Sequence, residues 1–183
     1  MVQQVQTEAG TTTRTIRIDR DVDTLLRQLS DEERVSVNHL VNRSLRKLVE
    51  WDSYADKFGV VSLPSALVHK MMDGLTEEQA KEIGGWVGRN LVREFLSFWF
   101  KEVTLRTVMR EYPRLNALYG KAFEFEEMKQ DGRWIIILKH GGGHKWSTFY
   151  AEVLRTLFEE VVDEPAAVEA TENQIVVRVA NPE

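Results

Sequence analysis

The N-terminal part of the chain is dominated by residues 11–51, which read TTTRTIRIDRDVDTLLRQLSDEERVSVNHLVNRSLRKLVEW. A short alternating stretch is followed by two amphipathic helical patterns with a tight turn between them. One strand and two helices of this length leave an apolar face uncovered, so they cannot close a core alone. We therefore expect a second copy of the chain to complete this fold, with two strands paired as a ribbon over four helices.

The alternating stretch predicts a strand with one polar and one mostly apolar face. Thr13, Thr15 and Arg17 fall on the polar face, whereas Ile16 and Ile18 fall on the other. A two-stranded ribbon fits the major groove of DNA, where arginine can pair bidentately with guanine and threonine offers a hydroxyl and a methyl group. The polar face of this strand therefore suits contact with base edges.

Two helices are expected after the strand, the first capped by Asp19 and the second by Ser36. Each carries an apolar stripe at helical spacing. The stripe of the first helix is Val22, Leu25, Leu26 and Leu29, and that of the second is Val37, Leu40, Val41, Leu45 and Leu48.

These features resemble the MetJ/Arc-type ribbon-helix-helix family of DNA-binding proteins. The resemblance lies in the strand TRTIRID, in its spacing to the first helix and in Ser-Val-Asn at the start of the second. It implies an intertwined dimer in which Thr13, Thr15 and Arg17 read base edges.

The resemblance also implies a phosphate clamp at residues Ser36, Val37 and Asn38, where free N–H groups of a helix start meet the DNA backbone. One departure from the family is the turn, which reads Glu-Glu-Arg-Val at residues 32–35 and lacks the common glycine. This departure concerns the geometry of the turn more than the fold.

The resemblance predicts a sequence-specific transcriptional regulator, such as a repressor, that binds double-stranded DNA as a homodimer or higher oligomer. Two alternatives remain open: an antitoxin-type protein that binds DNA at one end and a protein at the other, and a nucleoid-type architectural protein. No nucleotide-binding loop and no Gly-x-Ser-x-Gly motif occurs, and we expect neither an enzyme nor a cofactor.

The composition favours a cytoplasmic protein, and the resemblance implies that it is nucleoid-associated. The 183 residues include no cysteine, which excludes disulfides and thiolate metal sites, and no apolar run approaches a membrane span. The net charge is −5, but residues 11–50 hold eight Lys and Arg against seven Asp and Glu. The acidic excess therefore lies outside the expected DNA-binding segment, whose weak charge favours binding through dimerisation and assembly.

We expect an α+β fold in three parts: a flexible, polar tail at residues 1–10, the ribbon-helix-helix domain at residues 11–58, and a C-terminal α+β domain at residues 59–183. The last contains helices followed by a β-β-α-β-β order and is assigned to oligomerisation or to sensing a small-molecule effector. Its order is similar to that of small ligand-sensing domains of the 4-vinyl-reductase type. Helices are expected at 65–72, 76–101, 104–118 (interrupted by Pro113) and 145–162, and strands at 122–128, 134–139, 168–170 and 174–179.

Three features of the C-terminal half could carry chemistry. His140 and His144 flank three glycines, and such a pair is the one candidate for metal binding, although a loop is favoured and no metal is expected. The same glycines, followed by Lys145, could receive an anion. Four tryptophans could line an apolar ligand pocket, but core packing is the preferred interpretation. These tryptophans are Trp86, Trp99, Trp134 and Trp146.

Overall fold

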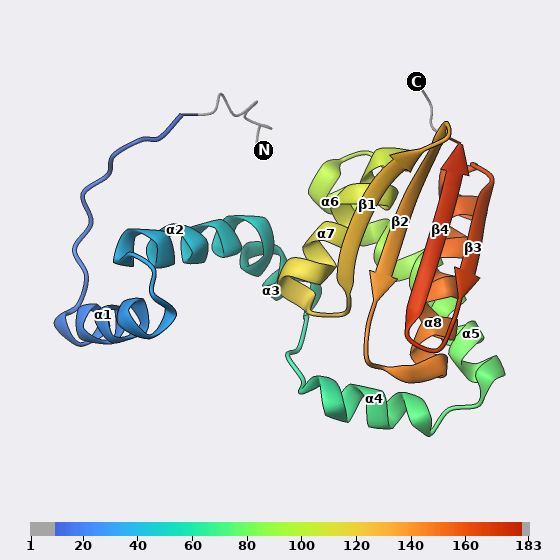
Figure 1. Cartoon of the computed structure of the whole chain (residues 1–183), viewed down its shortest axis with the longest axis horizontal. Coiled ribbons are helices and arrows are strands. Elements are labelled where there is room, and N and C mark those ends of the chain that lie inside the picture. Colours follow the sequence, from blue (N-terminus) through green and yellow to red (C-terminus); the bar gives the residue numbers. More distant parts are fainter. Residues whose placement is uncertain (1–9, 181–183) are drawn as a thin grey trace. The chain divides into compact units, whose positions relative to one another are not determined.

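The computed structural model describes residues 10–180, which form two compact units (Figure 1). The first unit extends to Arg46 and the second begins at Lys47. The expected tail at residues 1–10 lies outside the described residues apart from Gly10. No helix among residues 10–180 is both long enough and apolar enough to cross a membrane.

The N-terminal unit is built from two helices, α1 (Arg20–Glu33) and α2 (Val37–Lys47). Asp19 occupies the expected cap position of α1 with an extended backbone, but its side chain makes no capping hydrogen bond. Ser36 caps α2 as expected, because its Oγ accepts a hydrogen bond of 3.1 Å from the His39 N–H. The two helices of the expected segment and the turn between them are therefore present.

The division between the units falls earlier than the expected domain boundary at residue 58. Residues 47–58 contain η1 (Leu48–Asp52) and α3 (Ser53–Phe58), which end at Gly59 in the left-handed conformation. Trp51 stacks on Trp99 with ring centroids 5.5 Å apart, and the Tyr54 ring meets Phe98 at 5.3 Å. These aromatic contacts attach the segment to the second unit.

The second unit contains most of the helices, several of which include π-helical turns, labelled η. Thr76 and Gln79 form the expected capping box at the start of α5. Pro113 does not interrupt its helix as expected, since the chain stays helical on both sides of it through η3, α7 and η4. The remaining segments are α4 (Ser65–Asp73), α5 (Glu77–Val87), η2 (Gly88–Val92), α6 (Arg93–Phe100), η3 (Thr107–Glu111), α7 (Tyr112–Leu115), η4 (Asn116–Gly120), α8 (Gly143–Thr156) and η5 (Leu157–Val162).

A four-stranded antiparallel sheet in the order β1-β2-β4-β3 completes this unit. Its strands are β1 (Glu124–Gln130), β2 (Arg133–Lys139), β3 (Ala166–Ala170) and β4 (Gln174–Ala180). Asp131 and Gly132 turn the first hairpin with positive φ angles of 51° and 67°, as the Asp-Gly pair predicts. The β-β-α-β-β order of the expected α+β domain is confirmed.

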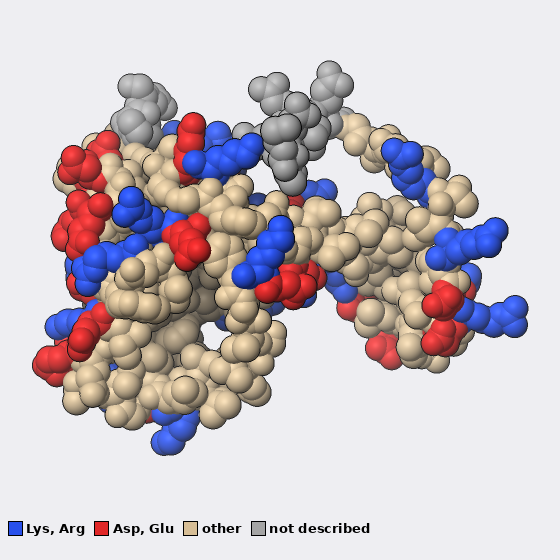
Figure 2. Space-filling model, turned by 180° about the vertical axis from the view of Figure 1, so that it is seen from behind, with Lys and Arg blue, Asp and Glu red and all other residues tan. Residues whose placement is uncertain are grey.

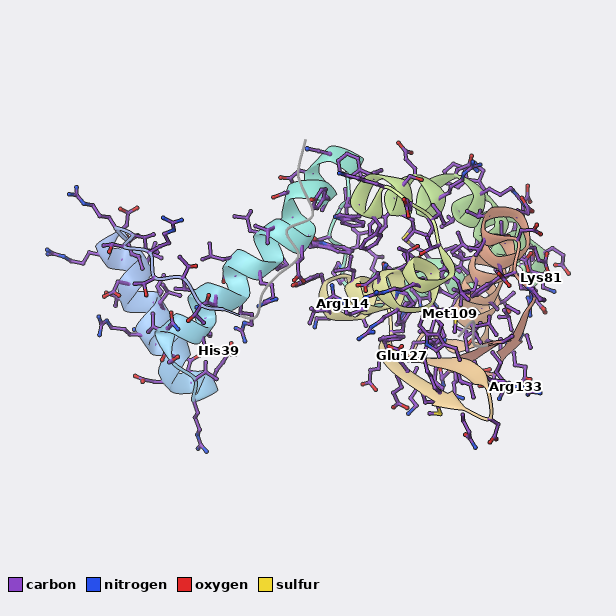
Figure 3. The ribbon with its side chains drawn as sticks, turned by 90° about the horizontal axis from the view of Figure 1, so that it is seen from above. His39, Lys81, Met109, Arg114, Glu127 and Arg133 are labelled. Carbon is purple, nitrogen blue, oxygen red and sulfur yellow. The ribbon has the colours of Figure 1, made fainter. Side chains whose placement is uncertain are left out.

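The core lies between this sheet and the helices behind it (Figure 1). Alternate residues of β2 and β4 are buried because period-two side chains share one face of a sheet. Ile136 pairs with Val177 in register, and both side chains are fully buried. Arg110 of η3 forms an ion pair of 3.5 Å with Glu127 of β1, which is labelled in Figure 3, so this helical segment and the strand are in contact.

Glycines allow α5 and η2 to approach α8 closely. A Cβ atom at Gly84 would lie 2.5 Å from the Phe149 carbonyl oxygen, and one at Gly88 would lie 2.9 Å from that of Val153. Ala80, one turn before Gly84, is fully buried. This stripe of small residues places α8 between the sheet and α5.

Candidate nucleic-acid interface

Residues 10–19 have no regular secondary structure in the single chain, so the expected strand is not formed there. The physical reason is that a strand needs a partner, and no other described segment pairs with this one. Thr13, Thr15 and Arg17 are all exposed within it. Their backbone groups make no hydrogen bond to any described residue, which leaves them available to pair with another chain.

The start of α2 offers free donors at the expected phosphate clamp. Ser36 Oγ is used by the His39 N–H, whereas no described group accepts from the N–H of Val37 or Asn38. The Asn38 side chain instead receives the Asn42 amide at 3.1 Å. Ser36 and Asn38 are exposed and Val37 is half-buried, so an anion could approach the two free N–H groups.

The turn between α1 and α2 contains a residue in the left-handed conformation although it has no glycine. Arg34 adopts the left-handed conformation, with φ 55° and ψ 42°, which a glycine would take at lower cost. Its N–H donates to the Asp31 carbonyl at 3.3 Å, and the Val35 N–H donates to that of Ser30 at 3.1 Å. Arg43 joins the two helices through two hydrogen bonds to the Glu33 carboxylate, at 2.7 and 3.0 Å.

Arginines without ion pairs lie on the extended segment, at the start of α1 and in the turn before α2. Within residues 10–180, no carboxylate lies within ion-pair distance of Arg14, Arg17, Arg20 or Arg34, whereas Arg27 is paired with Asp23 at 2.9 Å. Figure 2 shows basic side chains projecting from this unit beside acidic ones. Arg34 and Arg20 were not predicted as site residues. Arg34 lies in the turn that departs from the family pattern, and Arg20 follows the residue expected to cap α1.

The apolar stripes of the N-terminal unit are largely uncovered in the single chain. Leu40 is the one buried residue between Gly10 and Arg46. Leu25 is 63% exposed and Ile16 is 57% exposed, and many side chains of α1 and α2 point away from both helices (Figure 3). Further exposed members of the stripes are Ile18, Val22, Leu29 and Leu45.

His140 and His144 do not come together as metal ligands. His140 lies between β2 and α8, where its Nδ1 accepts from the Gly142 N–H and its Nε2 lies 2.9 Å from the Ser147 hydroxyl. Burial lowers the pKa of His140 to about 4, and the nearby His69 adds to the effect, so the ring is neutral. His144 is exposed on α8, and the described residues include no group of three potential ligands.

The glycines between β2 and α8 do not form an anion site either. The Gly142 N–H is taken by His140, and the Gly143 N–H donates to the Asn173 side chain at 3.0 Å. Lys145 also has another use, because its ammonium donates to the carbonyls of Asp73 and Leu75 at the end of α4. The N–H groups of Gly142 and Gly143 and the Lys145 ammonium are therefore engaged within the fold and not directed to an anion.

The four tryptophans have separate environments. Trp134 is buried on the sheet, where its Nε1 donates to Glu127 at 3.0 Å, and Trp99 lies in the aromatic cluster with Trp51. Trp86 is 52% exposed, whereas Trp146 lines a cavity. Trp134 is buried in the core and Trp146 packs against it, so the preferred core interpretation describes both of these but not the exposed Trp86.

The chain has no match among known protein families, curated proteins or solved structures. The resemblance to ribbon-helix-helix proteins is thus based only on the sequence pattern of residues 11–51.

Proposed function

We propose that this chain is a sequence-specific DNA-binding transcriptional regulator that acts as a dimer and inserts paired N-terminal strands into the major groove. The observation that carries the proposal is the uncovered apolar stripe of α1 and α2 beside an extended segment with unused backbone groups. Burying a leucine or isoleucine side chain contributes about 1.5–3 kcal/mol, so a second copy would gain much by covering this stripe. Pairing of the two extended segments would satisfy their backbone at the same time.

In the proposed complex the polar face of the ribbon carries Thr13, Thr15 and Arg17 to base edges. The free N–H groups of Val37 and Asn38 would then hold a phosphate, with Ser36 fixing the helix start. Arg34, unpaired and adjacent to this start, adds a cation for the DNA backbone. Through these contacts the protein would associate with the DNA of the nucleoid.

Higher assembly through the second unit is part of the proposal. Its helices expose large apolar side chains that a further copy could cover. These residues are Leu67, Met71, Ile83, Trp86, Leu91 and Phe98. The second unit also has its own buried core, which argues against an antitoxin tail that becomes ordered only on a partner.

The test starts from duplexes selected from a random pool, whose binding is measured by fluorescence anisotropy. We expect Arg17→Ala to weaken selected sites by about 1–3 kcal/mol and to relax sequence preference. Arg34→Ala should instead weaken all sequences alike and lower the salt dependence of binding by about one phosphate contact. Arg27→Ala is the matched control, since that arginine is paired with Asp23.

Unchanged affinity and sequence preference in the double variant Thr15→Ala, Arg17→Ala would exclude the proposed ribbon contacts. Binding with little sequence preference in the unmodified protein would favour an architectural role instead.

A further inference from the structure

The second unit contains a cavity of about 470 Å³ between α4, its preceding linker, α7 and the start of α8. This volume is within the range of small-molecule sites in proteins. Figure 2 shows a hollow in this unit bordered mainly by uncharged residues. The apolar part of the lining comprises Trp51, Val60, Leu63, Val68, Leu91, Val92, Phe95 and Trp146.

Two tyrosines with unpartnered hydroxyls line this cavity. Tyr112 and Tyr150 both line it, although only 5% and 8% of each residue is exposed. Neither phenol oxygen has a hydrogen-bond partner among residues 10–180. Within residues 10–180, Trp99 Nε1 is the one fully enclosed polar side-chain atom without a partner, so both phenol oxygens keep access to solvent and can donate to a ligand that enters the cavity.

The two tyrosines are fixed in place before any ligand arrives. The Tyr150 ring packs edge-on against Phe123 at 5.2 Å and Trp146 at 4.9 Å, and the Tyr112 ring packs edge-on against Phe95 at 5.9 Å. Burial raises the pKa of both phenols, and the neighbouring Tyr150 adds to the effect on Tyr112. Both hydroxyls therefore stay protonated and can donate.

The charges around the cavity favour an anion. No aspartate or glutamate lines it, whereas Lys121 does, and no described carboxylate lies within ion-pair distance of the Lys121 ammonium. His69 lies on the same wall, with its ring 5.5 Å from Trp146. A cationic ligand would meet Lys121 and find no counter-charge.

We propose that this cavity binds a small carboxylic acid anion with an aromatic or otherwise apolar body. The body would lie against Trp51, Phe95 and Trp146, while the carboxylate accepts hydrogen bonds from Tyr112 and Tyr150 and faces Lys121. Hydrogen bonds to a charged acceptor are stronger than those between neutral groups, which favours the carboxylate over an amide or ketone. Binding itself is independent of DNA; only its use in regulation rests on the proposed function.

Isothermal titration calorimetry of the full chain without DNA tests this site with matched probes. We expect naphthoate to bind at least tenfold more tightly than its neutral analogue naphthamide, and naphthylmethylamine to bind no better than the amide. Decanoate, with an aliphatic body, should also bind. Failure of both naphthoate and decanoate to bind would overturn the proposal, and so would equal binding of acid, amide and amine.

Variants then locate the site. Tyr112→Phe and Tyr150→Phe should each weaken naphthoate binding by about tenfold. Lys121→Gln should also weaken naphthoate binding. Tyr54→Phe, outside the cavity, should leave naphthoate binding unchanged. Because the two phenols have no partner in the fold, both phenylalanine variants should melt at or above the temperature of the unmodified protein. Naphthoate affinity unchanged in all three cavity variants would contradict the assignment, whatever the outcome of the DNA experiments.

Discussion

His140 shows how one side chain connects three segments of the second unit. Its Nδ1 accepts from Gly142, which leaves the proton on Nε2, so Nε2 donates to the Ser147 oxygen. The Ser147 hydroxyl in turn donates to the Glu172 carbonyl at 3.2 Å. Protonation of Nδ1 would break the first of these bonds, so the fold favours the neutral ring.

Because the fold favours the neutral His140 ring, the free energy of unfolding should decrease at acidic pH. The pKa of His140 falls from 6.5 to about 4 on folding, so the unfolded chain takes up the proton first as the pH decreases. Its contribution should be complete above pH 6.5 and should disappear between pH 6.5 and about pH 4. Urea unfolding followed by tryptophan fluorescence across this range should show a smaller decrease for His140→Gln than for the unmodified protein.

The control is His144→Gln, because His144 is exposed on the same helix. Identical pH dependence in the His140 variant and this control would show that burial does not lower the pKa of His140 in the folded protein.

At the scale of elements, the approach of α5 to α8 depends on the absence of side chains. The Cβ atom of an alanine at Gly84 would overlap the Phe149 carbonyl oxygen, which is backbone and cannot move aside easily. The adjacent Gly85 differs, since its Cβ would meet only the guanidinium end of Arg89 at 3.0 Å. Two neighbouring glycines in one helix therefore face different constraints.

Gly84→Ala should lower the free energy of unfolding by about 1–3 kcal/mol through overpacking. Gly85→Ala should be neutral or raise it by up to about 1 kcal/mol, because alanine is the better helix former. Chemical denaturation of the two variants measures both values. Equal effects at the two positions would mean that the α5–α8 contact is looser than described.

Elements with a local cause were predictable from the sequence, and those that depend on distant partners were not. Thr76 with Gln79, and Asp131 with Gly132, specify a helix start and a hairpin through neighbours in the chain. The stretch at residues 13–18 alternates like a strand, yet it needs another chain to become one. The π-helical turns around Pro113 have no signal that we recognised.

The candidate sites show the same limit. Residues 36–38 could be predicted as a helix start because that is a local pattern, and no described group accepts from the N–H of Val37 or Asn38 there. The cavity could not be identified, because its wall combines Trp51, Val60, Tyr112 and Trp146 from separate segments. Spacing alone cannot distinguish a core tryptophan such as Trp134 from one in a cavity wall.

At the scale of the whole molecule, the proposal requires that the N-terminal unit associate with a second copy. Leu25→Asp places a charge in the exposed stripe of α1 and should weaken dimerisation by roughly a hundredfold or more. Gln28→Asp, on the exposed surface of the same helix, is the charge-matched control. Sedimentation velocity over a range of concentrations compares the two variants; equal dimerisation would exclude this stripe as the interface.

The central claim is that two copies of the chain bind one DNA site through paired N-terminal segments. The most direct test is the solution mass of the full protein, measured by light scattering after gel filtration, with and without a selected duplex. The account predicts an even number of chains in both samples, with at least two chains on each duplex. A single chain per duplex, or a mass that does not change when DNA is added, would contradict it.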